Sequence, residues 1–190
     1  MNTLRVLLAT LVAVPLLAYS AASLTIAFVL RDVALPVAPK KAPSLAHRGL
    51  ACVTGSSARV VARHYRGSGR FLEGIPVELA LNVWLVHHFD DDQLIRLQGD
   101  RAWFGRQAYG QEAGARAWFG RSLEDLSIAQ ASLLVGMENS PHRFDPTLYP
   151  ATAWRRRQLV LGKWQACGLV PPGTAIALEQ SAVLSGVVRE

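Results

Sequence analysis

The sequence predicts an all-α protein with a long apolar segment at its amino terminus. Apolar residues recur at helical spacing, helix-capping residues and prolines divide the chain into segments, and no stretch shows sustained strand alternation. Of the 190 residues, 51% are hydrophobic and 18% are charged, so the chain is too apolar to be disordered over most of its length. This length suits one domain of ordinary size.

The first element is an uncharged run over residues 6–30. As a helix it is longer than the roughly 30 Å hydrocarbon core of a bilayer. Small residues at 18–23 also fit a signal-peptide cleavage site, but the apolar region of a signal has only about 7 to 15 residues. We therefore expect a retained transmembrane anchor over residues 1–31, a stiff linker over residues 32–44 and one domain over residues 45–190.

The first helices of that domain are expected between residues 76 and 119. A nearly all-apolar helix covers residues 76–89, with Pro76 at its first position and Glu78 in its first turn. The three aspartates at 90–92 suit the N-cap of a second helix, because carboxylates accept hydrogen bonds from free backbone N–H groups. Residues 109–119 predict a third helix.

Capping signals define the remaining helices. Ser127 and Gln130 form a capping box that opens an apolar helix reaching about residue 138. An amphipathic helix is expected over residues 151–167, and a last one follows a pair of prolines and reaches about residue 184.

Three blocks of sequence resemble a known family. Residues 92–110 end in Trp-Phe-Gly-Arg-Gln-Ala-Tyr-Gly, and residues 113–122 read Ala-Gly-Ala-Arg-Ala-Trp-Phe-Gly-Arg-Ser. Residues 126–146 open with Leu-Ser-Ile-Ala-Gln-Ala-Ser-Leu-Leu-Val-Gly and close with Ser-Pro-His-Arg-Phe-Asp-Pro. In this order and spacing they are similar to the back half of a peptidoglycan glycosyltransferase domain of glycosyltransferase family 51, the transglycosylase domain of penicillin-binding proteins and monofunctional transglycosylases.

The resemblance implies a lysozyme-like helical lobe behind one transmembrane helix, with the domain on the extracytoplasmic side of a bacterial inner membrane. The family polymerises lipid II, whose acceptor hydroxyl attacks a donor glycan while undecaprenyl pyrophosphate leaves. The implied partners are lipid II or another undecaprenyl-pyrophosphate-linked glycan, the membrane and cell-wall synthesis proteins. The net charge of +6 also suits nucleic acid, but an anchored domain fits that partner poorly, and we expect no nucleic-acid binding.

Glu78 matches one of the family's two carboxylates, that of an Arg-Lys-x-x-Glu motif. Gly74 and Ile75 replace the Arg-Lys pair here, so Glu78 lacks its cationic companions. As a catalytic residue it would help to stabilise the leaving pyrophosphate, together with basic side chains or a divalent cation such as Mg²⁺. As a structural residue it would complement the helix dipole for about 0.3 to 1 kcal/mol. The sequence leaves both roles open.

The other carboxylate of the family is missing. It acts as general base in a Glu-Asp-x-x-Phe-x-x-His-x-Gly motif. His47-Arg48-Gly49 resembles the end of that motif, but residues 42–54 contain no Glu. Only five residues separate Gly49 from Gly55, too few for the family's helix and mobile loop. The sequence therefore predicts a shortened and rewritten front of the active site.

A stripe of arginines is the expected substrate-binding feature of that front. Arg59, Arg63 and Arg66 recur at helical spacing, directly after Ser56 and Ser57, which stand where the family has Gly-Gly-Ser-Thr. Guanidinium groups suit pyrophosphate or anionic headgroups because they bind them with two parallel hydrogen bonds. A solvated surface beside a membrane is the alternative.

The sequence also bears on metal sites, cysteines and the core. His87 and His88 with the following aspartates are expected to end one helix and cap the next, since adjacent helical residues point about 100° apart and cannot easily share a metal. Cys52 and Cys167 match no metal or redox spacing, and the sequence cannot show whether they pair.

One shared core is expected for the large residues of the three blocks: Trp103, Phe104, Trp118, Phe119, Leu133 and Leu134.

Two functional hypotheses follow from these residues. The first is a membrane-anchored peptidoglycan glycosyltransferase-family protein that acts on or binds lipid II, with weak or no catalysis. The second is a pseudoenzyme or scaffold that binds glycan or cell-wall synthesis partners without chemistry. The missing Glu favours little turnover, because a positioned general base contributes about 10²- to 10⁴-fold to a rate.

Overall fold

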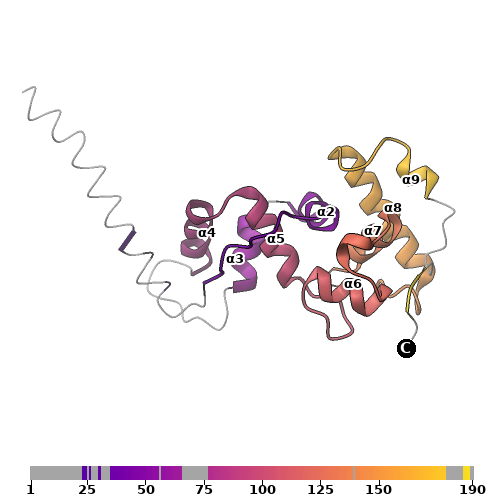
Figure 1. The fold of residues 1–190 in the computed structure, drawn as a ribbon, viewed down its shortest axis with the longest axis horizontal. Coiled ribbons are helices and arrows are strands. Elements are labelled where there is room, and N and C mark those ends of the chain that lie inside the picture. Colours follow the sequence, from indigo (N-terminus) through magenta and orange to yellow (C-terminus); the bar gives the residue numbers. More distant parts are fainter. Residues whose placement is uncertain are drawn as a thin grey trace, which may run out of the picture.

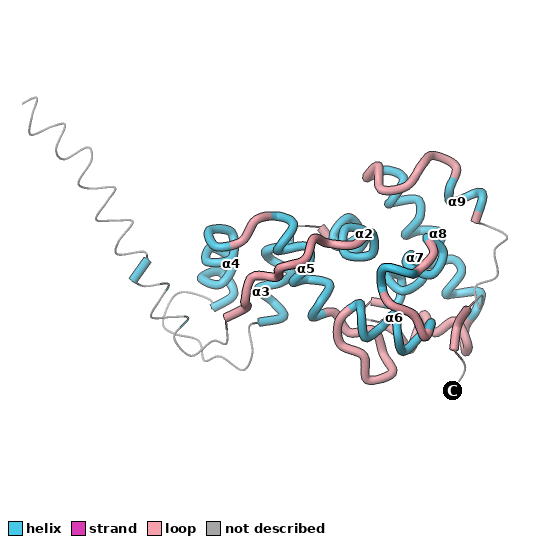
Figure 2. The backbone as a smooth tube through the Cα atoms, in the orientation of Figure 1, coloured by secondary structure: helices cyan, strands magenta, loops and turns pink. Residues whose placement is uncertain are grey.

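The computed structural model is helical, as expected. It describes residues 23–24, 26, 30, 35–55, 57–65, 77–138, 140–178 and 186–188, and these contain no strand beyond one isolated bridge between Trp103 and Tyr109. The elements, in chain order, are α2 (Leu45–Thr54), α3 (Ser57–Tyr65), α4 (Val77–His88), α5 (Asp91–Arg101), α6 (Gln111–Phe119), the 3₁₀ turn η1 (Leu123–Asp125), α7 (Ile128–Met137), α8 (Pro150–Ala166) and α9 (Thr174–Ala177) (Figure 1 and Figure 2).

Helices α4 to α8 form where the sequence predicts them, and local start signals are used at α5, α7 and α8. The Asp90 carboxylate caps α5 by accepting a hydrogen bond from the backbone N–H of Gln93 at 2.8 Å. The Ser127 hydroxyl caps α7 in the same way, with the N–H of Gln130 at 3.3 Å. Pro150 occupies the first turn of α8, where its missing N–H costs nothing.

The carboxyl-terminal boundaries are only partly those expected. Gly168 closes the turn after α8 with a φ of 71°, a left-handed conformation that favours glycine. The last helix, α9, covers only four residues, and most of the remaining segment to residue 184 lies outside the described residues.

Helix α2 was not among the expected helices. Its N-cap is Ser44, and its third residue, His47, takes the place of the Glu or Gln that completes an ordinary capping box. The backbone N–H of Ser44 donates to His47 Nδ1 at 3.3 Å, and the N–H of His47 donates to Ser44 Oγ at 3.5 Å. A capping box closed by histidine is not a recognised sequence signal, which explains the omission.

The buried apolar side chains form two clusters. The first joins α3, α4 and the first part of α5, and it includes Leu30. The second joins α2, α6, α7 and α8. Helix α5 connects them, since Leu94 and Leu97 belong to the first cluster and Ala102, directly after α5, belongs to the second. In Figure 1, α3 and α4 lie at one end of the described part, α8 and α9 at the other, and α2 and α5 between them.

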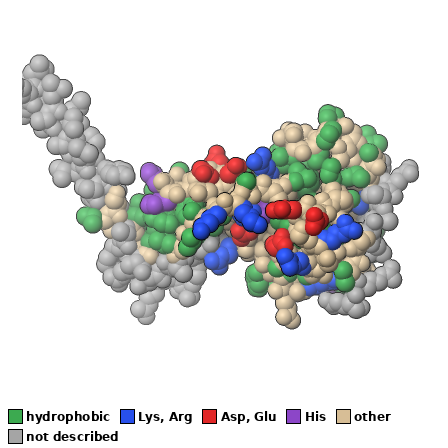
Figure 3. All heavy atoms as spheres, in the orientation of Figure 1, with side chains coloured by type: hydrophobic (Ala, Val, Ile, Leu, Met, Phe, Trp, Pro, Cys, Tyr) green, Lys and Arg blue, Asp and Glu red, His purple; other side chains and the backbone are tan. Residues whose placement is uncertain are grey.

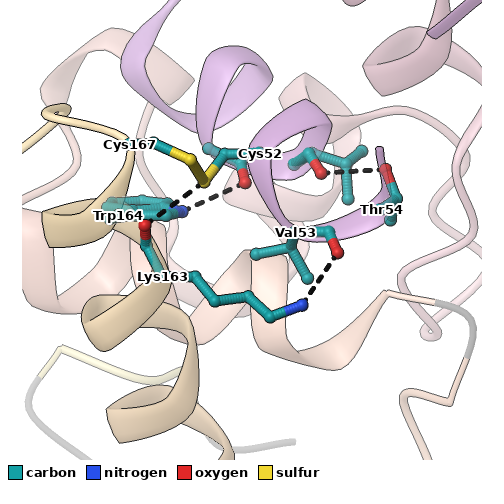
Figure 4. Close-up of a disulfide and its surroundings, with 8 residues drawn as sticks. Cys52, Val53, Thr54, Lys163, Trp164 and Cys167 are labelled. Carbon is teal, nitrogen blue, oxygen red and sulfur yellow. Dashed lines mark hydrogen bonds between the residues drawn. A yellow bond between two sulfur atoms is a disulfide. The ribbon is translucent and has the colours of Figure 1, made fainter. Parts of the chain in front are cut away.

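A disulfide ties α2 to the end of α8. Cys52 of α2 is bonded to Cys167, directly after α8, with their Cα atoms 6.5 Å apart (Figure 4). The structure thereby answers the question that the sequence left open. The bond joins positions separated by 115 residues, so it links an early helix, α2, to the end of α8.

The junction between α2 and α8 is tightly packed around this bond. The indole N–H of Trp164 donates to the carbonyl of Gly49 at 3.1 Å, and Lys163 Nζ donates to the carbonyl of Val53 at 3.1 Å (Figure 4). A Cβ atom on residue 49 would lie 2.2 Å from the Trp164 ring, so only glycine allows this approach.

The expected shared core is confirmed with one exception. Phe104 and Phe119 are buried in the second cluster, and the indole N–H of Trp118 donates to the Phe104 carbonyl at 2.7 Å. The expectation was wrong for Trp103, which is only partly buried and packs against the exposed ring of Tyr109, their centroids 4.5 Å apart. An isolated backbone bridge also joins these two residues.

The expected membrane anchor lies almost wholly outside the described residues. Of the run at 6–30, only Ser23, Leu24, Ile26 and Leu30 are described, all as helix. No helix within the described ranges is long and apolar enough to cross a bilayer.

Candidate functional site

The arginines and the carboxylate expected to meet a pyrophosphate lie on neighbouring helices. Arg59 is exposed on α3, which also carries Arg63. Glu78 is partly exposed in the first turn of α4, and α3 packs directly against α4. The helices that carry these residues are therefore neighbours, and Glu78 lies at the helix end that favours a negative charge.

The other expected binding residues are placed less completely. Ser57 is the first residue of α3, whereas Ser56 and Arg66 lie outside the described residues. Of the expected stripe of arginines, the structure describes the side chain of Arg59 and the helical backbone of Arg63.

A buried histidine, His47, lies in the first turn of α2. The His47 side chain is 1% exposed, and its Nδ1 lies 2.7 Å from Ser44 Oγ. Because Nδ1 already accepts the Ser44 N–H, the geometry assigns the ring proton to Nε2, which faces Asp100 Oδ1 at 3.4 Å. Residue 99 must be small, since a Cβ there would lie 2.4 Å from the imidazole ring. His47 thus fastens α2 to α5.

Amide side chains strengthen the same attachment. Gln98 of α5 donates to the hydroxyl of Thr54 at the end of α2. Gln111 of α6 donates to the carbonyl of Ala46 at 2.9 Å. Helix α2 is therefore held at both ends by side chains from other helices.

Paired charges cover the surface around α2 and α5. Figure 3 shows acidic and basic side chains mixed over the middle of the molecule. Three ion pairs are formed here: Arg48 with Asp92 at 3.7 Å, Arg96 with Asp100 at 3.7 Å, and Arg116 with Glu112 at 2.9 Å. Each of these carboxylates therefore has a cationic partner.

The perturbed carboxyl group among them is Glu112. Its pKa is held below the ordinary value, chiefly by the hydrogen bond that Oε2 accepts from the backbone N–H of Leu123 at 3.0 Å. Partial burial opposes this, and the ion pair with Arg116 adds to it. Glu112 therefore secures the turn after α6 as a carboxylate rather than serving as a free base.

The segment that leads into α2 carries lysines instead of acids. Lys40 and Lys41 are both exposed, and no Asp or Glu occurs between them and Gly55.

Other polar motifs have structural roles. His87 and His88 turn their Nδ1 atoms to the carbonyls of Val83 and Trp84, each at 2.8 Å, at the end of α4. This is the helix-end role expected for them. In the described part of the chain, no group of three or more His, Cys, Asp or Glu side chains could hold a metal.

The arginines of α8 are also structural. Arg157 is buried and donates to the carbonyl of Leu178 at 2.9 Å, and burial lowers the pKa of its guanidinium. Arg156 donates to the carbonyl of Gly136 at 3.2 Å and lies over the ring of Phe144, 5.2 Å from its centroid.

Sequence reasoning missed the connections of α2. His47 was interpreted only as a remnant of a catalytic motif, whereas it is a buried structural residue joined to Ser44 and Asp100. Gly49, in the same remnant, serves the close approach to Trp164. The spacing of Ser44 and His47, three residues apart, was the one local signal for this helix.

Comparison with known families identifies the fold. The family model described as Transglycosylase matches residues 63–165, more than half of the chain. The chain therefore belongs to the transglycosylase family, glycosyltransferase family 51, as the three sequence blocks indicated. The matched region includes Glu78 but begins after Arg59 and α2.

Curated relatives agree with this assignment. The chain is 29% identical over 140 residues to penicillin-binding protein 1A of Aquifex aeolicus, covering 72% of this chain and 19% of that protein. It is 27% identical over 93 residues to penicillin-binding protein 1A of Pseudomonas aeruginosa, covering 49% of this chain and 11% of that one. The corresponding protein of Streptococcus pneumoniae is 32% identical over 95 residues, covering 48% and 13%. The chain thus spans less than a fifth of the length of these relatives.

Proposed function

We propose that this chain is a membrane-anchored transglycosylase-family protein that binds lipid II in cell-wall synthesis and polymerises it weakly or not at all. The observation that carries the proposal is the positive charge of Lys40 and Lys41 in the segment that leads into α2. If His47 and Gly49 occupy the last positions of the family's Glu-Asp-x-x-Phe-x-x-His-x-Gly motif, the Glu and Asp positions fall on Lys40 and Lys41. An exposed ammonium group cannot accept a proton from the attacking hydroxyl.

Two described carboxylates near α2 are already engaged and are poor candidates to replace this base. Asp100 faces His47 and Arg96, and Glu112 is held by Leu123 and Arg116. The hydrogen bond from Leu123 and the ion pair with Arg116 lower the pKa of Glu112, which weakens it as a base. We therefore expect a loss in the range that a general base contributes, about 10²- to 10⁴-fold.

Binding can survive this loss. Arg59 and Arg63 belong to α3, which packs against α4, and the first turn of α4 carries Glu78, where we expect the leaving pyrophosphate of the family's substrate to be stabilised. Charge pairing demands less geometric precision than proton transfer. Carboxylate oxygens also suit Mg²⁺, so Glu78 could share a divalent cation with the phosphates.

The proposed location is the extracytoplasmic side of a bacterial inner membrane. The uncharged run at 6–30 supplies a single anchor of sufficient length. The disulfide between Cys52 and Cys167 supports this side of the membrane, because disulfides form and persist in oxidising compartments and are rare in the cytosol.

The alternative is a pseudoenzyme or scaffold that holds glycan or cell-wall synthesis proteins and does not use the pyrophosphate. A binding experiment separates the two. Purified full-length protein in detergent is titrated with fluorescent lipid II at low and moderate salt. Wild type should bind, and the Arg59→Ala/Arg63→Ala variant should bind at least about tenfold more weakly at low salt, where screening is least.

The matched control is Arg155→Ala. It removes an exposed arginine of α8, a helix that packs in the second cluster and not in the cluster of α3 and α4. Its affinity should equal that of wild type. Equal lipid II affinity in all three proteins would remove the pyrophosphate site and favour the scaffold.

A further inference from the structure

The disulfide between Cys52 and Cys167 lies at the surface of the domain. Cys167 is exposed, and Cys52 is partly buried. Gly168, next to Cys167, is exposed as well, and a Cβ atom added to it would meet no described heavy atom within 4 Å. This side of the bond is therefore open to a thiol-bearing molecule in the folded protein. Exposed disulfides exchange readily, whereas bonds enclosed in a core resist reduction.

The surroundings of Cys52 also suit the reduced state. Its Sγ lies 3.4 Å from the carbonyl oxygen of Lys163 (Figure 4). The sulfur carries no proton in the disulfide, but a Cys52 thiol would find this acceptor already in place. Cys167 would face solvent as a thiol, because it is exposed. The folded domain can thus accommodate both states of the cysteine pair.

The bond fixes the end of α2 directly before the chain enters α3. Gly55 closes α2 by donating its N–H to the carbonyl of Ala51 at 2.8 Å, and α3 begins two residues later, at Ser57. Residues of α2 are buried in the second cluster and residues of α3 in the first. This passage is therefore one of the connections between the two clusters, and the disulfide ties it to α8.

Weaker contacts hold the end of α2 when the bond is broken. Lys163 donates to the carbonyl of Val53 at 3.1 Å, and Gln98 donates to the hydroxyl of Thr54. Lys163 is exposed, so water competes for its hydrogen bond. The first half of α2, in contrast, keeps the buried Trp164 against its backbone. Reduction should therefore loosen the last turn of α2 and leave its first half in place.

We propose that the Cys52–Cys167 bond is a redox switch, which an extracytoplasmic partner with a Cys-x-x-Cys dithiol reduces in the folded protein, and that reduction frees the last turn of α2 and the passage into α3. The partner's thiolate attacks the Cys167 sulfur, the bond between the two sulfurs breaks, and Cys52 leaves as a thiolate that takes a proton from water. The partner's second thiol loses its proton, attacks the mixed disulfide and releases Cys167. The chain gains two electrons and two protons, and the partner's dithiol is oxidised to a disulfide.

The switch has a consequence for lipid II, and this part of the inference rests on the proposed function. Arg59 and Arg63, the proposed phosphate contacts, belong to α3. A loosened passage into α3 adds an ordering cost when a ligand binds to that helix. The oxidised protein should therefore bind lipid II more tightly than the reduced protein.

Reduction by a dithiol protein is tested first. Purified full-length protein in mild detergent is incubated with reduced thioredoxin as the probe, and free thiols are followed by alkylation and mass spectrometry. The folded protein should be reduced within about tenfold of the rate found for the same protein in urea, because the bond is exposed. A thioredoxin variant without its second cysteine should be trapped on Cys167. Reduction in urea alone, or trapping on Cys52, would overturn the proposal.

Hydrogen exchange in short labelling pulses then compares the oxidised and reduced proteins. Amides at residues 51–55 should exchange at least about tenfold faster after reduction, whereas the amides of α7, buried in the second cluster, should not change. The matched control is Cys52→Ser/Cys167→Ser, which should behave like reduced wild type and should not respond to thioredoxin. Unchanged exchange at residues 51–55, or an equal increase in α7, would refute a local switch.

Titration of the same samples with fluorescent lipid II measures the effect on binding. Oxidised wild type should bind at least about threefold more tightly than reduced wild type. Equal affinities would overturn the control of binding by the bond. If oxidised protein binds no lipid II while thioredoxin still loosens residues 51–55, the proposed function fails and the switch stands.

Discussion

Removing the disulfide between Cys52 and Cys167 should destabilise the domain strongly. The bond closes a loop between positions 115 residues apart, and a loop of this size corresponds to about 5 kcal/mol of chain entropy in the unfolded state at 25 °C. Other contacts at the junction persist without the bond, including the hydrogen bond from Trp164 to Gly49. Native disulfides typically contribute about 2 to 5 kcal/mol, and we expect a loss in that range for Cys52→Ser/Cys167→Ser.

Urea unfolding of the full chain in mild detergent, followed by tryptophan fluorescence, measures this loss. Wild type should unfold at a lower urea concentration after reduction with dithiothreitol, and the double serine variant should behave like reduced wild type. The variant is also the control, because dithiothreitol should not change its unfolding. If oxidised and reduced wild type unfold at the same urea concentration, α2 does not depend on the bond and the reasoning is wrong.

Three further predictions concern single substitutions. Phe119→Ala should lower the free energy of unfolding by about 3 to 5 kcal/mol, because Phe119 is buried. An unchanged midpoint of thermal unfolding would contradict the packing of Phe119 in the core. Gly49→Ala should lower the midpoint by separating α2 from the Trp164 ring, and a neutral result would refute that contact. Glu112→Gln should destabilise the domain at pH 7. Because folding lowers the pKa of Glu112, the stability difference between wild type and this variant should disappear as the pH falls through the lowered pKa. If urea titrations show the same difference at every pH, the charge of Glu112 is not its cause.

Local signals were sufficient for the helices that use them. Asp90, Ser127 and Pro150 start α5, α7 and α8 because their side chains or ring satisfy the demands of a helix N-terminus within a few residues. The nearly all-apolar sequence predicted the helix α4, but only the structure shows which of its residues are buried and which are exposed.

Long-range partners could not be derived in the same way. Cys52 and Cys167 are brought together by the packing of α2 on α8, and no spacing in the sequence encodes that approach. The same holds for His47 and Asp100, whose contact depends on the close passage of α2 over Gly99. The family resemblance even misdirected the interpretation of His47, since it suggested a catalytic remnant where the fold uses a buried structural residue.

The candidate site was predicted in part. The sequence predicts a missing general base and a substrate-binding role for Arg59, and both stay predictions; the structure shows that Arg59 and Glu78 lie on helices that pack together. The roles of Glu78, Arg63 and Ser57 remain predictions, as do those of Ser56 and Arg66 outside the described residues.

The central claim is that substrate binding persists without efficient glycan synthesis, and incubation of the purified full-length protein with lipid II tests it most directly. Glycan polymer and bound lipid II are measured in the same samples, with a penicillin-binding protein 1A as the positive control for polymerisation. We predict saturable lipid II binding with a polymerisation rate at least about 100-fold below that of the control, since the general base is missing. Glycan synthesis at a rate comparable to the control would contradict the account, and would require a base that Lys40 and Lys41 cannot provide.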